Sequence, residues 1–235
     1  MEVEFVFDKE KDMFNWWEAC NSKSWGVDWK EKAPEEVRKK IVGKTLDEVK
    51  DFLSDYLEIV YKKDKKLETF QKKLPKSWEE NKEKILDILE NIMGKFLVPK
   101  KLICYYTSFP RGPYDMNDFS WIQIPFFNNP KTGEFSVKKY ISGIVHELMH
   151  FQFHHYYWEE AKKLGLSETQ VGHLKEASTV LMNLYYDGIL GQDYGYDIHQ
   201  RLRKDLIKIW GETGNFENFL VKSVDLIKVK YSSLD

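Results

Sequence analysis

The five residues His146-Glu147-Leu148-Met149-His150 combine metal-ligating and acid–base side chains at a spacing that suits one metal ion. In a helix, His146 and His150 lie one turn apart and are offset by only about 40°, so both imidazoles can reach the same ion. Glu147 lies about 100° round the helix from His146. It would therefore sit beside the metal, where a general base takes a proton from a water held by the ion. The motif predicts a zinc site with Glu147 as the catalytic base.

The residues around this motif favour a metal site over a chance match. They make the expected helix apolar on most sides, so two histidines and a carboxylate would be costly to bury without partners. A metal ion supplies such partners. The apolar residues are Ile144, Val145, Leu148, Met149, Phe151 and Phe153.

The segment resembles the active-site helix of the zinc metallopeptidases called zincins. In that superfamily the two histidines bind zinc and the glutamate is the base, which implies these roles for His146, His150 and Glu147. Gln152 departs from the pattern, because zincins usually have an apolar residue two positions after the second histidine. We therefore expect polar groups on that side of the helix.

A catalytic zinc site needs a third protein ligand and an open position for water. The spacing HExxHxxGxxH is excluded, because Phe153 and Tyr156 stand where it needs glycine and histidine. Glu176, followed by Ala177, resembles the glutamate that completes the site in the gluzincin branch. The chain departs from that branch at Val180, where many gluzincins have an acid.

Helix geometry leaves the third ligand open. If the helices form a strict antiparallel hairpin about residue 166, His150 faces residue 182, which is about 9 Å along the helix from Glu176. A steep crossing or an earlier end of the first helix would remove this conflict. Asp187 is the alternative ligand, and His154, His173 and Glu168 are further candidates.

Several other polar residues are candidates for supporting roles. Asn183 and Asp187 share one helical face with Glu176 and can orient the ligands. His154 lies one turn beyond His150 and either lines the cleft or binds a second metal. The candidates for stabilising an oxyanion are His199, Tyr185 and Tyr186.

The expected elements form an α+β protein that is mostly helical, zincin-like, and contains a small mixed or antiparallel sheet. We expect residues 1–98 to form a mostly helical region packed on the core, and the resemblance to zincins implies that 99–235 form a zincin-like metallopeptidase core. Strands are expected at 1–7, 102–106 and 120–127, and helices at 8–20, 45–62, 77–96, 137–164, 167–186, 197–210 and 216–230. Capping boxes at Thr45/Glu48, Ser77/Glu80 and Ser167/Gln170 give three of the helix starts, and Gly165 is the expected C-terminal cap of the motif helix.

Residues 121–125 precede the motif helix, where zincins place the edge strand that aligns a substrate. Pro125 cannot donate a ladder hydrogen bond, which suits an edge strand, and a peptide substrate could pair with such an edge. A plain sheet strand without a substrate role is the alternative. The loop 107–119 is long enough to be functional.

Composition excludes several classes of protein. The chain has 235 residues with 42% hydrophobic and 15% aromatic residues, which is typical of a globular protein. Its formal net charge of −2 gives no electrostatic basis for binding nucleic acid or an anionic membrane. No run of 18 apolar residues and no signal peptide is found, so the cytoplasm is the expected location. Cys20 and Cys104 match no metal or redox spacing, and whether they pair stays open.

The sequence therefore predicts a zinc-dependent hydrolase, a peptidase acting on a peptide or protein. One alternative is a metal-stabilised zincin-like binding or regulatory module without proteolytic activity. A lesser one is a di-iron carboxylate protein, which would need two ExxH motifs, whereas Glu147-x-x-His150 is the only one here.

Overall fold

A computed structural model describes residues 1–63, 66–95, 99, 101–126, 136–185 and 188–234. The chain forms two compact units, Met1–Glu80 with Pro99–Gly143 and Asn81–Val98 with Ile144–Asp235. It passes from one unit to the other at 80/81, 98/99 and 143/144. Each unit therefore draws on both of the regions, 1–98 and 99–235, that the sequence suggested.

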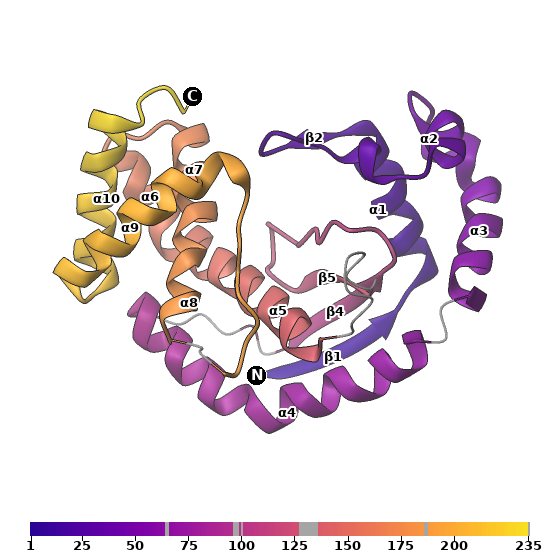
Figure 1. The fold of residues 1–235 in the computed structure, drawn as a ribbon, viewed down its shortest axis with the longest axis horizontal. Coiled ribbons are helices and arrows are strands. Elements are labelled where there is room, and N and C mark those ends of the chain that lie inside the picture. Colours follow the sequence, from indigo (N-terminus) through magenta and orange to yellow (C-terminus); the bar gives the residue numbers. More distant parts are fainter. Residues whose placement is uncertain (64–65, 96–98, 100, 127–135, 186–187, 235) are drawn as a thin grey trace. The chain divides into compact units, whose positions relative to one another are not determined.

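The first unit is built on a three-stranded sheet in the order β1-β4-β5 (Figure 1). Its strands are β1 (Glu2–Phe7), β4 (Lys101–Thr107) and β5 (Trp121–Pro125), close to the expected ranges. Phe5 lies opposite Cys104, and Cys104 lies opposite Ile122. Both cysteines of the chain, Cys20 and Cys104, are buried free thiols.

This sheet is parallel throughout, so the expectation of a mixed or antiparallel sheet is wrong for it. The physical reason lies in the connections. Parallel neighbours need a crossover of about a dozen residues or more, and residues 108–120 supply one between β4 and β5. Antiparallel pairing occurs in a separate two-stranded pair, β2 (Lys23–Ser24) and β3 (Val27–Asp28).

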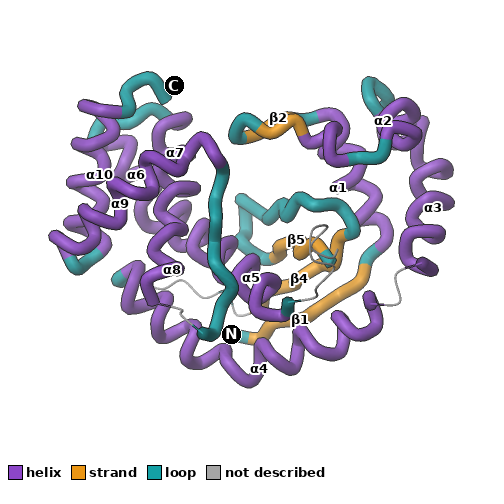
Figure 2. The backbone as a smooth tube through the Cα atoms, viewed as in Figure 1, coloured by secondary structure: helices purple, strands orange, loops and turns teal. Residues whose placement is uncertain are grey.

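The connection between β4 and β5 folds back along β5 (Figure 2). The Asp115 amide donates to the Trp121 carbonyl at 2.9 Å, and the Gln123 amide donates to the Pro113 carbonyl at 2.8 Å. Backbone groups on the outer edge of β5 are thus already paired. Alignment of a substrate on 121–125 stays a prediction, and it would require this segment to move.

The buried carboxylate of Asp12 fixes where that connection begins. It accepts hydrogen bonds from Thr107 Oγ1 at 2.6 Å, Ser108 Oγ at 2.7 Å and Tyr61 Oη at 2.7 Å. Burial outweighs these bonds and raises the pKa of Asp12. We interpret this network as structural, because these three hydroxyl groups donate their hydrogen bonds to the Asp12 carboxylate.

The helices of the first unit follow their local sequence signals with one exception. They are α1 (Lys9–Asn21), η1 (Trp29–Lys32), α2 (Glu35–Ile41), α3 (Leu46–Lys63) and the first part of α4 (Lys66–Met93). The exception is α4, which begins at Lys66 rather than at Ser77 and continues through Pro75. Its buried stripe, with Phe70, Leu74 and Trp78, runs across the proline, so apolar burial outweighs the missing amide.

The second unit is helical and carries the HExxH motif. Beyond the end of α4, it contains most of α5 (Val137–Gln152), a π-helical turn η2 (Phe153–Tyr157), α6 (Trp158–Lys163), α7 (Glu168–Ser178), η3 (Thr179–Leu181), α8 (Met182–Tyr185), η4 (Asp197–His199), α9 (Gln200–Thr213) and α10 (Phe216–Lys230). The single helix expected over 137–164 is therefore divided by the π-helical turn. Gly165 ends α6 with a φ of 103°, as expected of a C-terminal cap.

Among the described residues, no helix has both the length and the apolar character needed to cross a membrane.

Candidate metal centre

The helix α5 presents the two histidines of the motif on one face, as the spacing predicts. The His146 and His150 rings lie 4.4 Å apart between centroids. Ile144, Val145 and Leu148 are fully buried and fix the helix in the core. The His150 side chain is 2% exposed and that of His146 is 18% exposed, so both imidazoles are largely removed from water.

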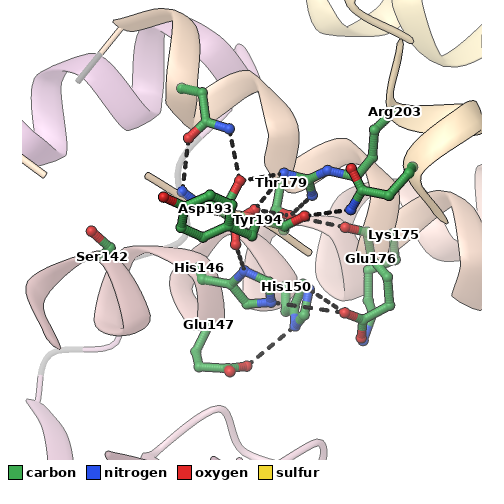
Figure 3. A network of polar contacts seen from close by, with 12 residues as sticks. Ser142, His146, Glu147, His150, Lys175, Glu176, Thr179, Asp193, Tyr194 and Arg203 are labelled. Carbon is green, nitrogen blue, oxygen red and sulfur yellow. Dashed lines mark hydrogen bonds and ion pairs between the residues drawn. The ribbon is translucent and has the colours of Figure 1, made fainter. Parts of the chain in front are cut away.

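Glu176 comes to these histidines from α7. That helix starts at the predicted capping box, in which Ser167 and Gln170 bond each other's backbone. The Oε2 atom of Glu176 lies 3.8 Å from His146 Nε2 and 3.6 Å from His150 Nε2. The structure thus brings together the three residues that the sequence selected as ligands (Figure 3).

The strict hairpin that would have placed His150 opposite residue 182 does not form. The helix that carries the motif stops being α-helical after Gln152, and the π-helical turn ends at Tyr157 with φ −123° and ψ −14°. The α-helix of the motif is thus interrupted after Gln152, and the chain becomes α-helical again in α6, as far as Lys163.

The three donor atoms fit a zinc ion in kind and spacing. One ligand atom from each residue lies within 4.8 Å of the others. In a tetrahedral site with bonds of about 2.0–2.2 Å, neighbouring donors are about 3.3–3.6 Å apart. The two distances from Glu176 Oε2 to the histidine nitrogens, 3.8 and 3.6 Å, are close to that spacing. Among the described residues, three side chains supply the donor atoms of this group, which is the number in a catalytic zinc site with an open position for water.

Glu147 lies beside the donor group rather than in it. Its Oε2 atom is 3.2 Å from His150 Nδ1, the ring nitrogen that does not face Glu176. The side chain is 15% exposed, so water can reach it. This position agrees with the expectation that Glu147 is off the line of the ligands.

Sequence reasoning missed Asp193, which holds the first histidine. Its Oδ1 atom lies 3.3 Å from His146 Nδ1. Its Oδ2 atom accepts hydrogen bonds from Arg203 Nη2 at 2.9 Å and from Thr179 Oγ1 at 2.7 Å. Asn183 fixes the same loop, since its amide bonds the Asp193 carbonyl and amide at 2.8 and 2.9 Å. Asn183 thus lies near the site as expected, but acts on the Asp193 backbone.

Asp193 escaped notice because it lies in a loop without periodicity. One signal was present. Gly195 has a φ of 60°, and a Cβ there would lie 2.7 Å from Arg203 Nη1. Only glycine allows the guanidinium to approach the backbone at this point. The glycines of this loop were therefore the sequence signal that its backbone packs closely against another side chain.

Lys175 is a second neighbour that the motif did not reveal. Its Nζ atom lies 2.9 Å from Glu176 Oε1, and both side chains are nearly buried. Together with Arg203, it places two cations beside the three carboxylates of the centre.

These charges shift the pKa values of the centre in opposite directions. Burial opposes charge on His146, but Asp193 and Glu176 outweigh it and hold the pKa of that imidazole well above its usual value. Burial and the Lys175 ammonium lower the pKa of His150. Burial alone would raise the pKa of Glu176, but His150 and Lys175 hold it well below its usual value. Glu176 is therefore an anion, as a metal ligand must be.

The remaining candidates are distributed around the centre. His154 lies in the π-helical turn and stacks on Trp158 at 4.6 Å, and burial lowers the pKa of His154 to about 3. His173 pairs with His199 at 2.8 Å between Nδ1 and Nε2. Glu168 is on the surface, 3.0 Å from Lys162.

Of the two tyrosine candidates, Tyr185 lies among the described residues. The Tyr185 hydroxyl accepts a hydrogen bond from Trp210 Nε1 at 2.6 Å, and the tyrosine is 44% exposed. Tyr186 and Asp187 lie outside the described residues. A role of His199 or Tyr185 toward an oxyanion stays a prediction.

Comparisons with family models, with curated proteins and with solved structures gave no match to this chain.

Proposed function

We propose that this protein is a zinc-dependent hydrolase that cleaves peptide bonds. The observation that carries the proposal is the meeting of His146, His150 and Glu176, with Glu147 adjacent but outside the donor group. Two imidazoles and one carboxylate are a donor set of catalytic zinc sites. A glutamate beside the donor group, but not part of it, could act as the general base that hydrolysis requires.

The residues of the centre suggest how hydrolysis would proceed. Zinc held by the three donors would polarise the carbonyl of a peptide bond and lower the pKa of a water molecule toward ~7. Glu147 would accept a proton from the water as its oxygen adds to the carbonyl carbon. Glu147 would then pass the proton to the nitrogen of the leaving amine. The C–N bond would break, and the products would be a carboxylic acid and an amine.

A second function is favoured by one contact. The approach of Glu147 Oε2 to His150 Nδ1 gives the glutamate a structural use, because a carboxylate can orient a ligating imidazole. A metal-stabilised binding module without hydrolytic activity would keep this contact. The two functions predict the same metal content and differ in catalysis.

Metal content is the first test. Untagged protein should hold about one zinc per chain, and the His146→Ala/His150→Ala double variant should hold none. Elemental analysis of both proteins decides this. Full zinc in the double variant would place the metal elsewhere and end the proposal.

Catalysis is the second test. Glu147→Gln should retain zinc and lose about 10²–10⁴-fold in the rate of peptide hydrolysis, because the amide cannot accept the proton. A panel of quenched peptides, assayed at equal zinc occupancy, measures the rates. Asp197→Asn, on an exposed residue of η4, is the matched control. Equal rates in wild type and Glu147→Gln would assign any activity to another source, and zinc binding without hydrolysis would favour the binding module.

A further inference from the structure

The two carboxylate oxygens of Glu176 face different partners (Figure 3). Oε2 lies 3.6 Å from His150 Nε2 and 3.8 Å from His146 Nε2, where a metal would bind. Oε1 lies 2.9 Å from Lys175 Nζ. One oxygen is therefore turned to the donor group and the other to an ammonium.

The contact of Lys175 with Glu176 is not what neighbouring residues on a helix usually make. Consecutive residues point about 100° apart, and side chains at i and i+1 do not face each other. Lysine is also almost never buried unless it is paired. Here the side chains are 6% and 5% exposed, and the Lys175 Nζ atom nevertheless lies 2.9 Å from the adjacent carboxylate.

This pair limits what Glu176 can do as a ligand. Carboxylates bind metals through one oxygen or through both. Binding through both would require Oε1 to turn from Lys175 toward the ion, which would break an ion pair between two nearly buried groups. Breaking such a pair is strongly unfavourable. The ammonium therefore favours binding through Oε2 alone.

We propose that Lys175 is a positioning residue that restricts Glu176 to one-oxygen binding of the metal. The inference rests on the proposed function of the metal centre. It adds that Lys175 controls how many oxygen atoms of Glu176 bind the metal. With one oxygen from Glu176 and one nitrogen from each histidine, the ion keeps an open position for water or substrate. A second carboxylate oxygen would occupy that space.

The charge of Lys175 has a second consequence. An ammonium beside a cation site repels a divalent ion, so Lys175 lowers affinity while it fixes geometry. Removing the charge should therefore tighten zinc binding. A lysine that served only the stability of the fold would not act in this way, since its loss would loosen the site and weaken binding.

The test compares wild type, Lys175→Met and Lys175→Arg, each loaded with zinc or with Co²⁺. A crystal structure of the zinc-loaded wild type should show Oε2 about 2.0–2.2 Å from the metal, with Oε1 still on Lys175. The visible absorption of the cobalt-loaded wild type should be that of a four-coordinate site. Lys175→Met should lose several-fold in that absorption as Oε1 joins the metal, and should bind zinc roughly tenfold more tightly in chelator competition.

Two further variants make the comparison specific. Lys175→Arg keeps the charge and should retain the wild-type spectrum. Lys162→Met removes a lysine whose partners, Glu159 and Glu168, lie on the surface, and should change neither spectrum nor affinity.

The outcomes separate this inference from the proposed function. Failure of the wild type to bind zinc or cobalt would end both. Metal binding with Glu176 coordinated through both oxygens in the wild type would overturn the role of Lys175 alone. An unchanged spectrum or weaker zinc binding in folded Lys175→Met would do the same. If Lys175→Met does not fold, the zinc-loaded wild-type structure still decides the question.

Discussion

Each donor side chain of the centre has its second polar atom held by a neighbour. His146 Nδ1 faces Asp193, His150 Nδ1 faces Glu147, and Glu176 Oε1 faces Lys175. The atoms left on the other side of each group, Nε2, Nε2 and Oε2, are those that face one another. If the centre binds a metal, such support would fix the ligands beforehand, which is the usual purpose of outer contacts in metal sites.

The donors could be predicted from sequence and their supports could not. The histidines lie at a fixed spacing on one helix, and helix geometry alone brings them together. Asp193 comes from a loop without periodicity, whose backbone is bonded by Arg203 of α9, so no helix or strand pattern identifies it. The use of Lys175 depends on a side-chain conformation that spacing does not determine.

The support of His146 gives a prediction about metal affinity. Asp193→Asn keeps the size of the side chain but removes the charge that orients the imidazole. We expect zinc affinity to fall about 10–100-fold, as is typical when an outer partner of a ligand is lost. Competition with a chromophoric chelator measures it, with Asp197→Asn as control. Unchanged affinity in Asp193→Asn would show that the loop serves packing alone.

The buried pair of His173 and His199 gives a prediction about pH. Burial and the neighbouring His173 lower the pKa of His199 to about 4, below an unfolded value near 6.5. The unfolded chain therefore binds a proton at pH 5 that the folded protein excludes. The stabilisation is complete above about pH 6.5 and is lost as pH falls toward 4.

Urea unfolding of wild type and His199→Gln at pH 7.5 and pH 5 measures this effect. The glutamine does not titrate, so wild type should lose about 1–2 kcal/mol more stability than the variant between these pH values. Equal losses in the two proteins would mean that His199 is protonated in the folded state.

At the scale of elements, the sequence predicted helices best where a capping signal and an apolar stripe agree. The helix α7 begins at the capping box of Ser167, and α3 begins within a residue of Thr45. Ser77 carries the same signal but lies inside α4, because the apolar stripe extends beyond it toward Lys66. Parallel pairing of β1, β4 and β5 was missed, since strand direction depends on long connections rather than on strand composition.

The π-helical turn η2 is the element that the periodicity could not predict. It directly follows the motif, and π-helical turns in other proteins are frequent at functional sites. Its ends are fixed, because Phe153 and Tyr157 are buried and the Tyr157 hydroxyl bonds the Met93 carbonyl. The extra residue in this turn therefore sets how the motif is rotated relative to α6.

Deleting His155, an exposed residue of that turn, should restore an α-helical repeat. One residue fewer rotates one side of the helix by about 100° relative to the other, so the histidines and Tyr157 cannot both keep their positions. We expect the deletion variant to keep its helical circular dichroism and to lose bound zinc. His155→Ala should keep both. Full zinc content in the deletion variant would show that the turn is not needed to align the ligands.

At the scale of the whole molecule, the α+β class and the predominance of helix were predicted, and the division into units was not. Every residue of the candidate centre belongs to the unit of Asn81–Val98 and Ile144–Asp235, and the β1-β4-β5 sheet belongs to the other. That division crosses α4 and α5, two helices that sequence patterns treat as single elements. The division into units depends on contacts between distant segments of the chain, and local periodicity does not show such contacts.

Zinc should therefore stabilise one unit more than the other. A ligand that binds only the folded state stabilises it by RT ln(1 + [L]/Kd), which is about 2.7 kcal/mol at a free zinc concentration of 100 Kd. The ligands lie on α5 and α7, and Asp193 links them to α9 through Arg203. Openings of these helices that separate the ligands would release the metal, so zinc should slow the amide exchange that occurs through such openings.

Hydrogen exchange followed by mass spectrometry, with zinc and with a chelator, tests this expectation. Peptides from α7 and α9 should gain protection with zinc, and those from β1, β4 and β5 should change much less. The His146→Ala/His150→Ala variant should show no zinc effect in either unit, which controls for zinc bound elsewhere. Equal gains across both units of the wild type would show that they open together. In that case the metal would stabilise the entire chain, and the two units would form one cooperative folding unit.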